Sequence, residues 1–268
     1  MGGSLALALR ARGLHISGVD IDPQAAALAL EMGAVERAGV DPAELLDGAE
    51  VVILAVPVRA ILSIMDALPS WMSKPAIVMD LGSTKQAIVE RMADLPARFD
   101  PLGGHPMCGK EQSSLRYAEA GLYQDAPFAL CALERTSRHA QEICERLVEM
   151  VGARPLWVTP GAHDRMVAST SHLPYLAACA LAGSVPLEAA PLVGPGFRSA
   201  ARLAASNMEM MLDILLTNRQ AVLAGLDRFT NEIGRLQEHL AAGDEDSLRA
   251  ELRRMAAAQA DLSGREKG

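Results

Sequence analysis

A histidine in an uncrowded setting is the first candidate for chemistry in this sequence. His105 lies in the stretch LGGHPMCGKE, after two glycines and directly before a proline. The glycines remove side chains that would crowd the ring, and the proline disfavours helix at the residue before it. We therefore expect a loop that presents the imidazole. The alternative is a loop histidine without a catalytic role.

Other polar residues occur in short stretches that could join His105. Ser83, in DLGSTK, follows an apolar run, which predicts a place at the carboxyl end of a strand, where ligands bind in open α/β sheets. Its alternative role is that of a helix cap. His172 precedes a Leu-Pro pair in STSHLPY, and its alternative role is structural. Arg198 and Arg202 are four residues apart, which predicts one face of a helix; a solvated helix face is the alternative.

The remaining histidines and the cysteines lack such a context. His15, His139, His163 and His239 are expected to be surface or packing residues, and the sequence shows no metal-ligand cluster. The four cysteines are widely spaced and form no C-x-x-C pair. Reduced thiols in a cytoplasmic protein are the simplest interpretation.

Elements that would position these residues alternate along the first 160 residues. Strands are predicted at 14–20, 51–56, 76–82, 127–133 and 154–159, and helices at 23–33, 59–68, 85–95 and 138–152. This alternation predicts an α/β fold of the Rossmann type, with a doubly wound and mostly parallel sheet.

The second part of the chain is predicted to be all-helical. Residues 161–184 and 197–262 are rich in Ala, Leu and Met with helical spacing, and two late helices are expected to meet at Gly243, the second capped by Asp244 or Asp246. We therefore expect a dinucleotide-binding domain at 1–160 and a helical substrate and dimerisation domain at 161–268. A homodimer through the helical domain is predicted; the alternative is an extension that only covers the sheet.

The chain begins with the end of a dinucleotide-binding motif. In MGGSLALALRARG, Gly2 and Gly3 open a predicted helix, and the following strand ends in Asp20, which can bind ribose hydroxyls and favours NAD over NADP. Asp22 is close enough to compete for that role. The alternatives are a flexible N-terminus and an ordinary turn acid. The first strand and the first glycines of the motif are missing, for which we expect a start codon assigned too late or a truncated chain, with a true deletion as the alternative.

Composition argues against several classes of partner. The formal net charge is −8 and aromatic residues make up 3% of the 268 residues, so neither a basic surface nor a stacking platform for nucleic acid is expected. No apolar run reaches membrane-spanning length, and no secretory signal is seen. The predicted location is the cytoplasm.

These stretches, in this order, resemble the prephenate and arogenate dehydrogenases of tyrosine biosynthesis. The matching parts are MGGSLALAL, VDIDP, VILAVPV, DLGSTK, GGHPMCGKEQS, HLP, GFRSAARLAAS and DILLTNR. The resemblance implies NAD-dependent oxidative decarboxylation of prephenate to 4-hydroxyphenylpyruvate, of arogenate to tyrosine, or of both. The residues do not decide between these two small-molecule substrates.

The resemblance also implies roles for individual residues. His105 would take the proton of the ring hydroxyl, and Ser83 would orient that hydroxyl. The substrate-binding residues implied are Arg202 and Arg198 for carboxylates, His172, and Glu111. Glu111 would gate the entrance or pair with an arginine, and a surface acid without a role is its alternative. Contacts to NAD are implied for Gly2, Gly3, Asp20, Val56, Pro57 and Ser83.

Two departures from the family pattern bear on these expectations. The glycine motif is incomplete, and Ser199 and Met211 stand where the family often has an acidic residue and a tryptophan. The alternatives are therefore a truncated non-catalytic homologue, or another dehydrogenase of the same domain plan that acts on hydroxy or imino acids.

Overall fold

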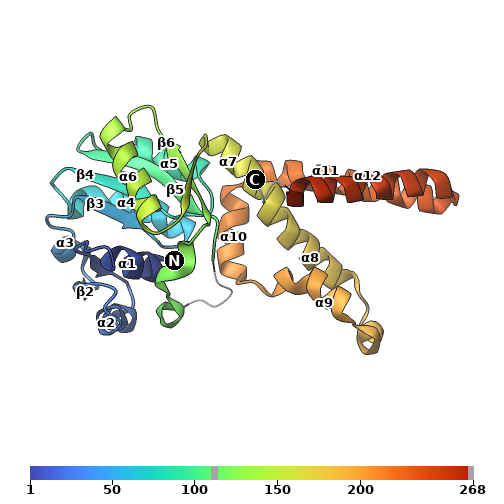
Figure 1. Cartoon of the computed structure of the whole chain (residues 1–268), viewed down its shortest axis with the longest axis horizontal. Coiled ribbons are helices and arrows are strands. Elements are labelled where there is room, and N and C mark those ends of the chain that lie inside the picture. The colour runs from blue at the N-terminus through green and yellow to red at the C-terminus, as the bar shows by residue number, and fades with distance from the viewer. Residues whose placement is uncertain (110–113, 265–268) are drawn as a thin grey trace. The chain divides into compact units, whose positions relative to one another are not determined.

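The computed structural model describes residues 1–109 and 114–264 (Figure 1). By internal contacts the chain divides into two compact units, Met1–Arg219 and Gln220–Gly268. The first unit holds the sheets and the shorter helices of the second part of the chain.

The larger sheet has five strands in the order β3-β4-β5-β6-β7. Its strands are β3 (Val51–Leu54), β4 (Ala76–Asp80), β5 (Phe99–Pro106), β6 (Pro127–Ala132) and β7 (Arg154–Trp157). All neighbours are parallel except β5 and β6. A separate parallel pair consists of β1 (Ser17–Val19) and β2 (Arg37–Gly39). The predicted α/β class and mostly parallel sheet are confirmed.

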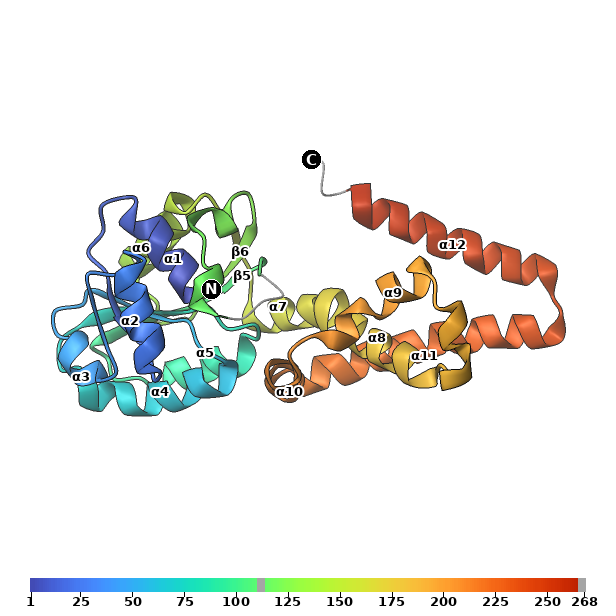
Figure 2. The same ribbon diagram turned by 90° about the horizontal axis from the view of Figure 1, so that it is seen from below.

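Helices cover both faces of the larger sheet (Figures 1 and 2). Alternate residues of β4 point to opposite sides, so that Ile77 and Met79 join one apolar cluster and Val78 joins the other. The first cluster includes side chains of α1 (Gly2–Arg10) and α6 (Arg138–Met150). The second includes side chains of α4 (Val58–Trp71) and α5 (Gln86–Ala93). The result is a three-layer α/β arrangement with two cores.

Two helices beside β1 and β2 begin with the same local signal. α2 (Pro23–Glu31) and α3 (Pro42–Leu45) each start with a proline after an aspartate. Asp22 accepts a hydrogen bond from the Gln24 amide and Asp41 one from the Ala43 amide, both at 2.9 Å. The aspartate satisfies an amide that the helix leaves unbonded, and proline tolerates the first helical position.

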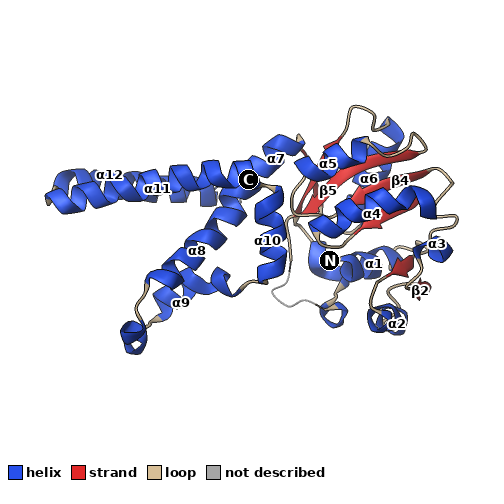
Figure 3. Cartoon of the chain, turned by 180° about the vertical axis from the view of Figure 1, so that it is seen from behind, coloured by secondary structure: helices blue, strands red, loops and turns tan. Residues whose placement is uncertain are grey.

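The second part of the chain is helical, as predicted, and all described strands lie before it (Figure 3). In the first unit its elements are α7 (Pro160–Val167), a π-helical turn (Ala168–His172), α8 (Leu173–Ser184), a 3₁₀ helix (Leu187–Leu192), α9 (Pro195–Ala201), a 3₁₀ turn (Arg202–Ala205) and α10 (Met208–Thr217). None of the described helices is both long and apolar enough to cross a membrane.

The second unit consists of α11, which begins at the unit boundary (Arg219–Ala242), and α12 (Glu245–Gly264). Gly243 joins them with a φ of 64°, a conformation that favours glycine. Asp244 accepts a hydrogen bond from the Ser247 amide at 3.0 Å. The predicted turn at Gly243 is confirmed, and of the two predicted caps, Asp244 and Asp246, it is Asp244 that binds the amide.

Two strands were missed, and one of them carries His105. The sequence predicted a presenting loop, but residues 99–106 form β5, in which His105 pairs with Ala129 of β6. The prediction was wrong because glycine and proline usually mark loops. Here Gly103 and Gly104 allow close packing instead: an added Cβ at Gly103 would lie 3.2 Å from Cys131 Cβ. The other missed strand is the three-residue β2.

Candidate active site

Several predicted site residues lie at one edge of the larger sheet. Because β3, β4 and β5 are parallel, their carboxyl ends share this edge. Val56 and Pro57 follow β3, Ser83 follows β4, and His105 is the penultimate residue of β5. This is the edge at which open α/β sheets bind ligands.

A buried ion pair holds the backbone before His105. Asp80 and Lys85 are both fully buried, and the Lys85 ammonium donates to the Asp80 carboxylate. Lys85 Nζ also donates to the Gly104 carbonyl at 2.6 Å, and Asp80 Oδ1 accepts from the Gly104 amide at 3.1 Å. An added Cβ at Gly104 would lie 2.5 Å from the Asp80 carbonyl oxygen. Gly104 is therefore fixed through both of its backbone groups, and a side chain there would displace the strand.

A second histidine and a carboxylate line up behind His105. The Nδ1 atom of His105 lies 2.8 Å from His163 Nε2, and His163 Nδ1 lies 2.8 Å from Asp164 Oδ1. His163 and Asp164 are each 3% exposed. His163 was expected to be a surface or packing residue, so its hydrogen bond to His105 was not predicted. The available signal was two adjacent titratable residues in the first turns of a helix.

Asp164 also caps a helix that it does not belong to. Its carboxylate oxygens accept from the backbone amides of Lys85 at 2.7 Å and Gln86 at 2.9 Å, where α5 begins. Capping of α5, the alternative role of Ser83, is thus performed by Asp164. Ser83 itself is partly buried beside the same turn.

His172 belongs to the same buried polar cluster. It ends the π-helical turn, is 1% exposed, and its Nδ1 lies 3.3 Å from Asn218 Nδ2. Asn218 Nδ2 also donates to the Asp164 carbonyl at 2.7 Å. Single π-helical turns are frequent at functional sites because they redirect a side chain. Asn218 stood in a matching stretch of the sequence but had no assigned role.

Burial keeps His105 and His172 neutral. It is the main reason why the pKa of His105 lies well below its ordinary value, and the charges of Lys85, His163 and His172 act in the same direction. Burial also lowers the pKa of His172 to about 4, although Asp164 opposes that shift. At neutral pH the His105 imidazole is therefore unprotonated and can accept a proton.

The two arginines are exposed and lie on elements that contact α8, the helix that follows His172. The prediction of one α-helical face is wrong in detail, because α9 ends at Ala201 and Arg202 opens the 3₁₀ turn. Arg198 lies within α9. Glu111, the remaining predicted substrate-binding residue, lies outside the described residues.

The start of α1 and the end of β1 fit a dinucleotide. The first turn of α1 has neither a side-chain cap nor an acidic residue, so its amides can face a phosphate. An added Cβ at Gly2 would lie 2.9 Å from Ala55 Cβ, so glycine permits the close approach of helix and strand. Asp20 is exposed directly after β1, whereas its competitor Asp22 is used as the cap of α2.

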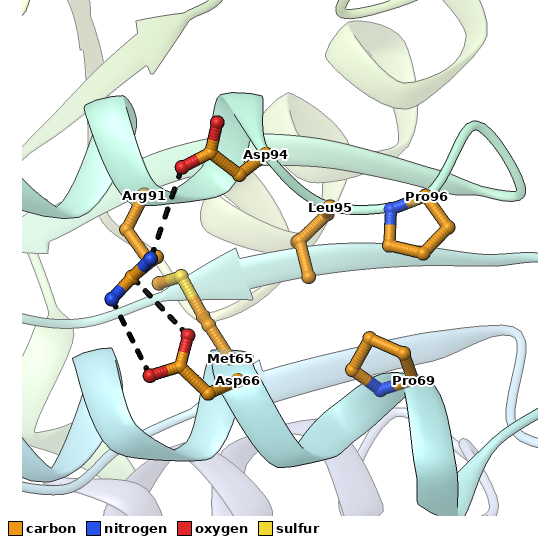
Figure 4. A pocket seen from close by; sticks show the side chains of 7 residues that line it. All are labelled: Met65, Asp66, Pro69, Arg91, Asp94, Leu95 and Pro96. Carbon is orange, nitrogen blue, oxygen red and sulfur yellow. Dashed lines mark hydrogen bonds and ion pairs between the residues drawn. The ribbon is translucent and has the colours of Figure 1, made fainter.

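Other features of the described residues suggest no further site. No group of three or more His, Cys, Asp or Glu residues among them could hold a metal ion. A pocket is lined by Met65, Asp66, Pro69, Arg91, Asp94, Leu95 and Pro96, none of which is a candidate residue (Figure 4). Arg91 in that pocket pairs with Asp66 at 3.3 Å and Asp94 at 3.8 Å.

A Rossmann-type sheet with a polar carboxyl edge and a helical second part defines the class of dinucleotide-dependent oxidoreductases. The chain belongs to the prephenate dehydrogenase family. The family model for the prephenate dehydrogenase nucleotide-binding domain matches residues 5–156, and that for the prephenate dehydrogenase dimerization domain matches residues 159–254. The family recognised in the sequence is therefore confirmed.

Individual relatives agree with this assignment. The chain is 31% identical over 260 residues to a prephenate dehydrogenase of Bacillus subtilis, covering 92% of this chain and 70% of the relative. A crystal structure of A. aeolicus prephenate dehydrogenase with hydroxyphenyl propionate and NAD+ is similar with a TM-score of 0.90 and 29% identity, covering 98% of this chain and 94% of that one. Synechocystis arogenate dehydrogenase is similar with a TM-score of 0.84 and 28% identity, covering 97% and 95%. The chain is an NAD-dependent oxidoreductase. Neither the non-catalytic homologue nor a dehydrogenase of hydroxy or imino acids gains support.

Proposed function

We propose that His105 is the base in the reaction of this chain, the NAD-dependent oxidative decarboxylation of prephenate, arogenate or both. The observation that carries this role is the setting of its ring. Nδ1 is bound to His163 at 2.8 Å, while Nε2 has no hydrogen-bond partner among residues 1–109 and 114–264. A neutral imidazole with one nitrogen engaged and the other at a ligand-binding edge suits proton transfer.

NAD, when bound, would supply the acceptor for the hydride that leaves the carbinol carbon of the substrate ring. The chain's own part is to bind the hydroxyl of that carbon and remove its proton, which passes to His105 Nε2. Ser83 orients the hydroxyl toward the imidazole. The bond to the ring carboxylate then breaks, carbon dioxide leaves, and the electron pair makes the ring aromatic. The phenolic oxygen takes a proton back.

The substrate carries two carboxylates, whereas the chain has a formal net charge of −8, so local cations are needed. Arg202 and Arg198 bind these carboxylates in our proposal, because a guanidinium offers two parallel donors to a carboxylate. His172 donates a hydrogen bond to the substrate or positions Arg202, and Glu111 gates the entrance. The support is the exposure of both arginines on elements that contact α8, next to His172.

NAD is bound in this proposal along the edge formed by α1, β1, β3 and β4. The amides of Gly2 and Gly3 would hold the pyrophosphate, and Asp20 would accept from the ribose hydroxyls. Val56, Pro57 and Ser83 line the path toward the nicotinamide. The uncapped start of α1 and the exposed position of Asp20 support this arrangement.

We further propose that residues 1–160 bind the cofactor, that residues 161–268 bind substrate, and that the helical part forms a homodimer. The description of the second family model as a dimerization domain supports the dimer. Large apolar side chains support it as well, since Leu187 and Leu192 are 90% and 88% exposed and Met208 is 67% exposed. The proposed location is the cytoplasm, supported by four free cysteines.

The test is a spectroscopic assay of NADH formation with NAD and each of the two substrates. We expect turnover with at least one substrate. His105→Asn should abolish turnover while the dissociation constant for NAD stays unchanged, and His139→Asn, on the exposed face of α6, serves as the matched control. Full turnover by His105→Asn would refute its role as the base.

A further inference from the structure

We propose that Asp164 and His163 are positioning residues that fix the ring tautomer of His105, so that its lone pair lies at Nε2. This inference rests on the proposed role of His105 as the base. It concerns which nitrogen of each ring carries hydrogen, a property that the hydrogen-bond partners determine.

The Asp164 carboxylate is held as an acceptor. It accepts hydrogen bonds from the backbone amides of Lys85 and Gln86, at 2.7 and 2.9 Å, and both donors lie at the start of α5. Its Oδ1 also lies 2.8 Å from His163 Nδ1. An ionised carboxylate can only accept hydrogen bonds, so His163 Nδ1 must carry the hydrogen.

The tautomer of His163 then determines that of His105. A neutral His163 with hydrogen on Nδ1 has its lone pair on Nε2, which lies 2.8 Å from His105 Nδ1. The two rings meet edge to face, with centroids 5.0 Å apart and planes at 71°. His105 Nδ1 must therefore donate, which leaves the lone pair on Nε2. The opposite tautomer would place a hydrogen where the substrate proton has to go.

The same chain of groups stabilises the charge that forms on His105. When Nε2 takes a proton, Nδ1–H still donates to His163, and His163 Nδ1–H still donates to the negative Asp164. The other charged or titratable groups that act on His105 are Lys85, which is paired with Asp80, and His172. Among these groups of the described residues, Asp164 is the one carboxylate that is linked to His105 by hydrogen bonds through another imidazole, that of His163.

The direct test is nitrogen-15 NMR of the full chain with labelled histidine, at a pH where the rings are neutral. We expect His105 and His163 each to show a protonated Nδ1 and an unprotonated Nε2. In His163→Phe the acceptor for His105 Nδ1–H is absent, so the form of His105 with hydrogen on Nε2 should gain population. A spectrum of the unaltered chain with hydrogen on His105 Nε2 would overturn the proposal.

Kinetics provide a second readout. Asp164→Asn should lower kcat by a factor of about 10²–10⁴, the range of general-base catalysis, with little change in the dissociation constant for NAD. Asp94→Asn, at a side chain 76% exposed, is the matched control. Because Asp164 also caps α5, His163→Phe removes the acceptor without touching the cap. Unchanged kcat in a folded Asp164→Asn or His163→Phe variant would refute the inference.

The two proposals fail in different ways. If His105→Asn keeps its turnover while NMR shows the expected tautomers, the assignment of the base is wrong and the tautomer assignment stands. If His105→Asn is inactive but Asp164→Asn and His163→Phe turn over normally, the base is right and the positioning role is wrong.

Discussion

Lys85 and Asp80 form a salt bridge in which neither side chain is exposed, and each of them also binds the backbone of Gly104. The pair thus joins the end of β4 and the turn after it to the strand that carries His105. A buried charge is costly unless it is paired and hydrogen-bonded, and here both conditions are met.

Removing one member of this pair should destabilise the chain strongly. Lys85→Met leaves Asp80 buried without a counter-ion, which predicts a loss of about 3–5 kcal/mol in the free energy of unfolding. The double variant Asp80→Asn/Lys85→Met should lose less than the sum of the two single variants. Urea denaturation followed by circular dichroism measures both. Lys74→Met, which breaks the exposed pair with Asp47, is the control and should change stability little.

Gly104→Ala should disturb the site through sterics alone. Its Cβ would lie 2.5 Å from the Asp80 carbonyl oxygen, which is backbone and cannot rotate away. We expect a loss of about 1–3 kcal/mol in stability, as for other overpacked positions, together with lower kcat. An added Cβ at Gly121 would have no atom within 4 Å, so Gly121→Ala should change neither stability nor kcat. Equal behaviour of the two variants in thermal melts would contradict the close-packing argument.

Stability should depend on pH in a range set by the histidines. The pKa of His105 lies well below its ordinary value and that of His172 is about 4, whereas both are ordinary, at about 6.5, in the unfolded chain. Below pH 6.5 the unfolded state therefore binds more protons, and the free energy of unfolding falls as the pH falls. For His172 the loss is complete near pH 4. Above about pH 6.5 this contribution no longer changes.

Urea titrations between pH 7 and 5 would measure this slope with little interference from carboxylates. A His172→Gln variant should show a smaller slope, because one of the two titrating groups is gone. The exposed His139→Gln should keep the full slope. A slope that is the same in His172→Gln would show that His172 is not buried as a neutral ring.

Asn218 should act on substrate binding through His172. Its amide is anchored on the Asp164 carbonyl and faces His172 Nδ1, so Asn218→Ala frees the imidazole to turn. We expect a higher KM for the ring substrate with a smaller change in kcat and an unchanged dissociation constant for NAD. Asn231→Ala, at an exposed position of α11, is the control. A change confined to kcat would point instead to the contact with Asp164.

The sequence predicted the elements that follow simple patterns. The run VVILAV became β3, and the turn at Gly243 was predicted to the residue. The cap was predicted at Asp244 or Asp246, and the structure selects Asp244. These features depend on neighbours in the sequence, such as apolar runs and capping residues. The position of Ser83 after β4 was predicted in the same way, from the apolar run that precedes it.

Features that depend on distant contacts were not predicted. The strand β5 has a loop-like composition, and it forms because Gly104 fits against Asp80, 24 residues earlier. Similarly, His163 lies 58 residues after His105, and no local pattern indicates that their rings touch. The capping of α5 by Asp164 could not be predicted from neighbouring residues either, because Asp164 belongs to another helix, α7.

The reversal of direction between β5 and β6 has a consequence for how this site can vary. β6 runs antiparallel to β5, so the connection from Met107 to Ala126 leaves and re-enters the sheet at the edge where His105 lies. Part of it rests on α1, since Tyr123 donates to the Met1 carbonyl at 2.9 Å and the Glu119 amide donates to Ser4 Oγ at 3.1 Å. Longer loops cost little extra entropy. Insertions in this connection can therefore remodel the mouth of the site while the strand registers stay unchanged, which makes it the natural segment for diversifying substrate choice in a library of variants.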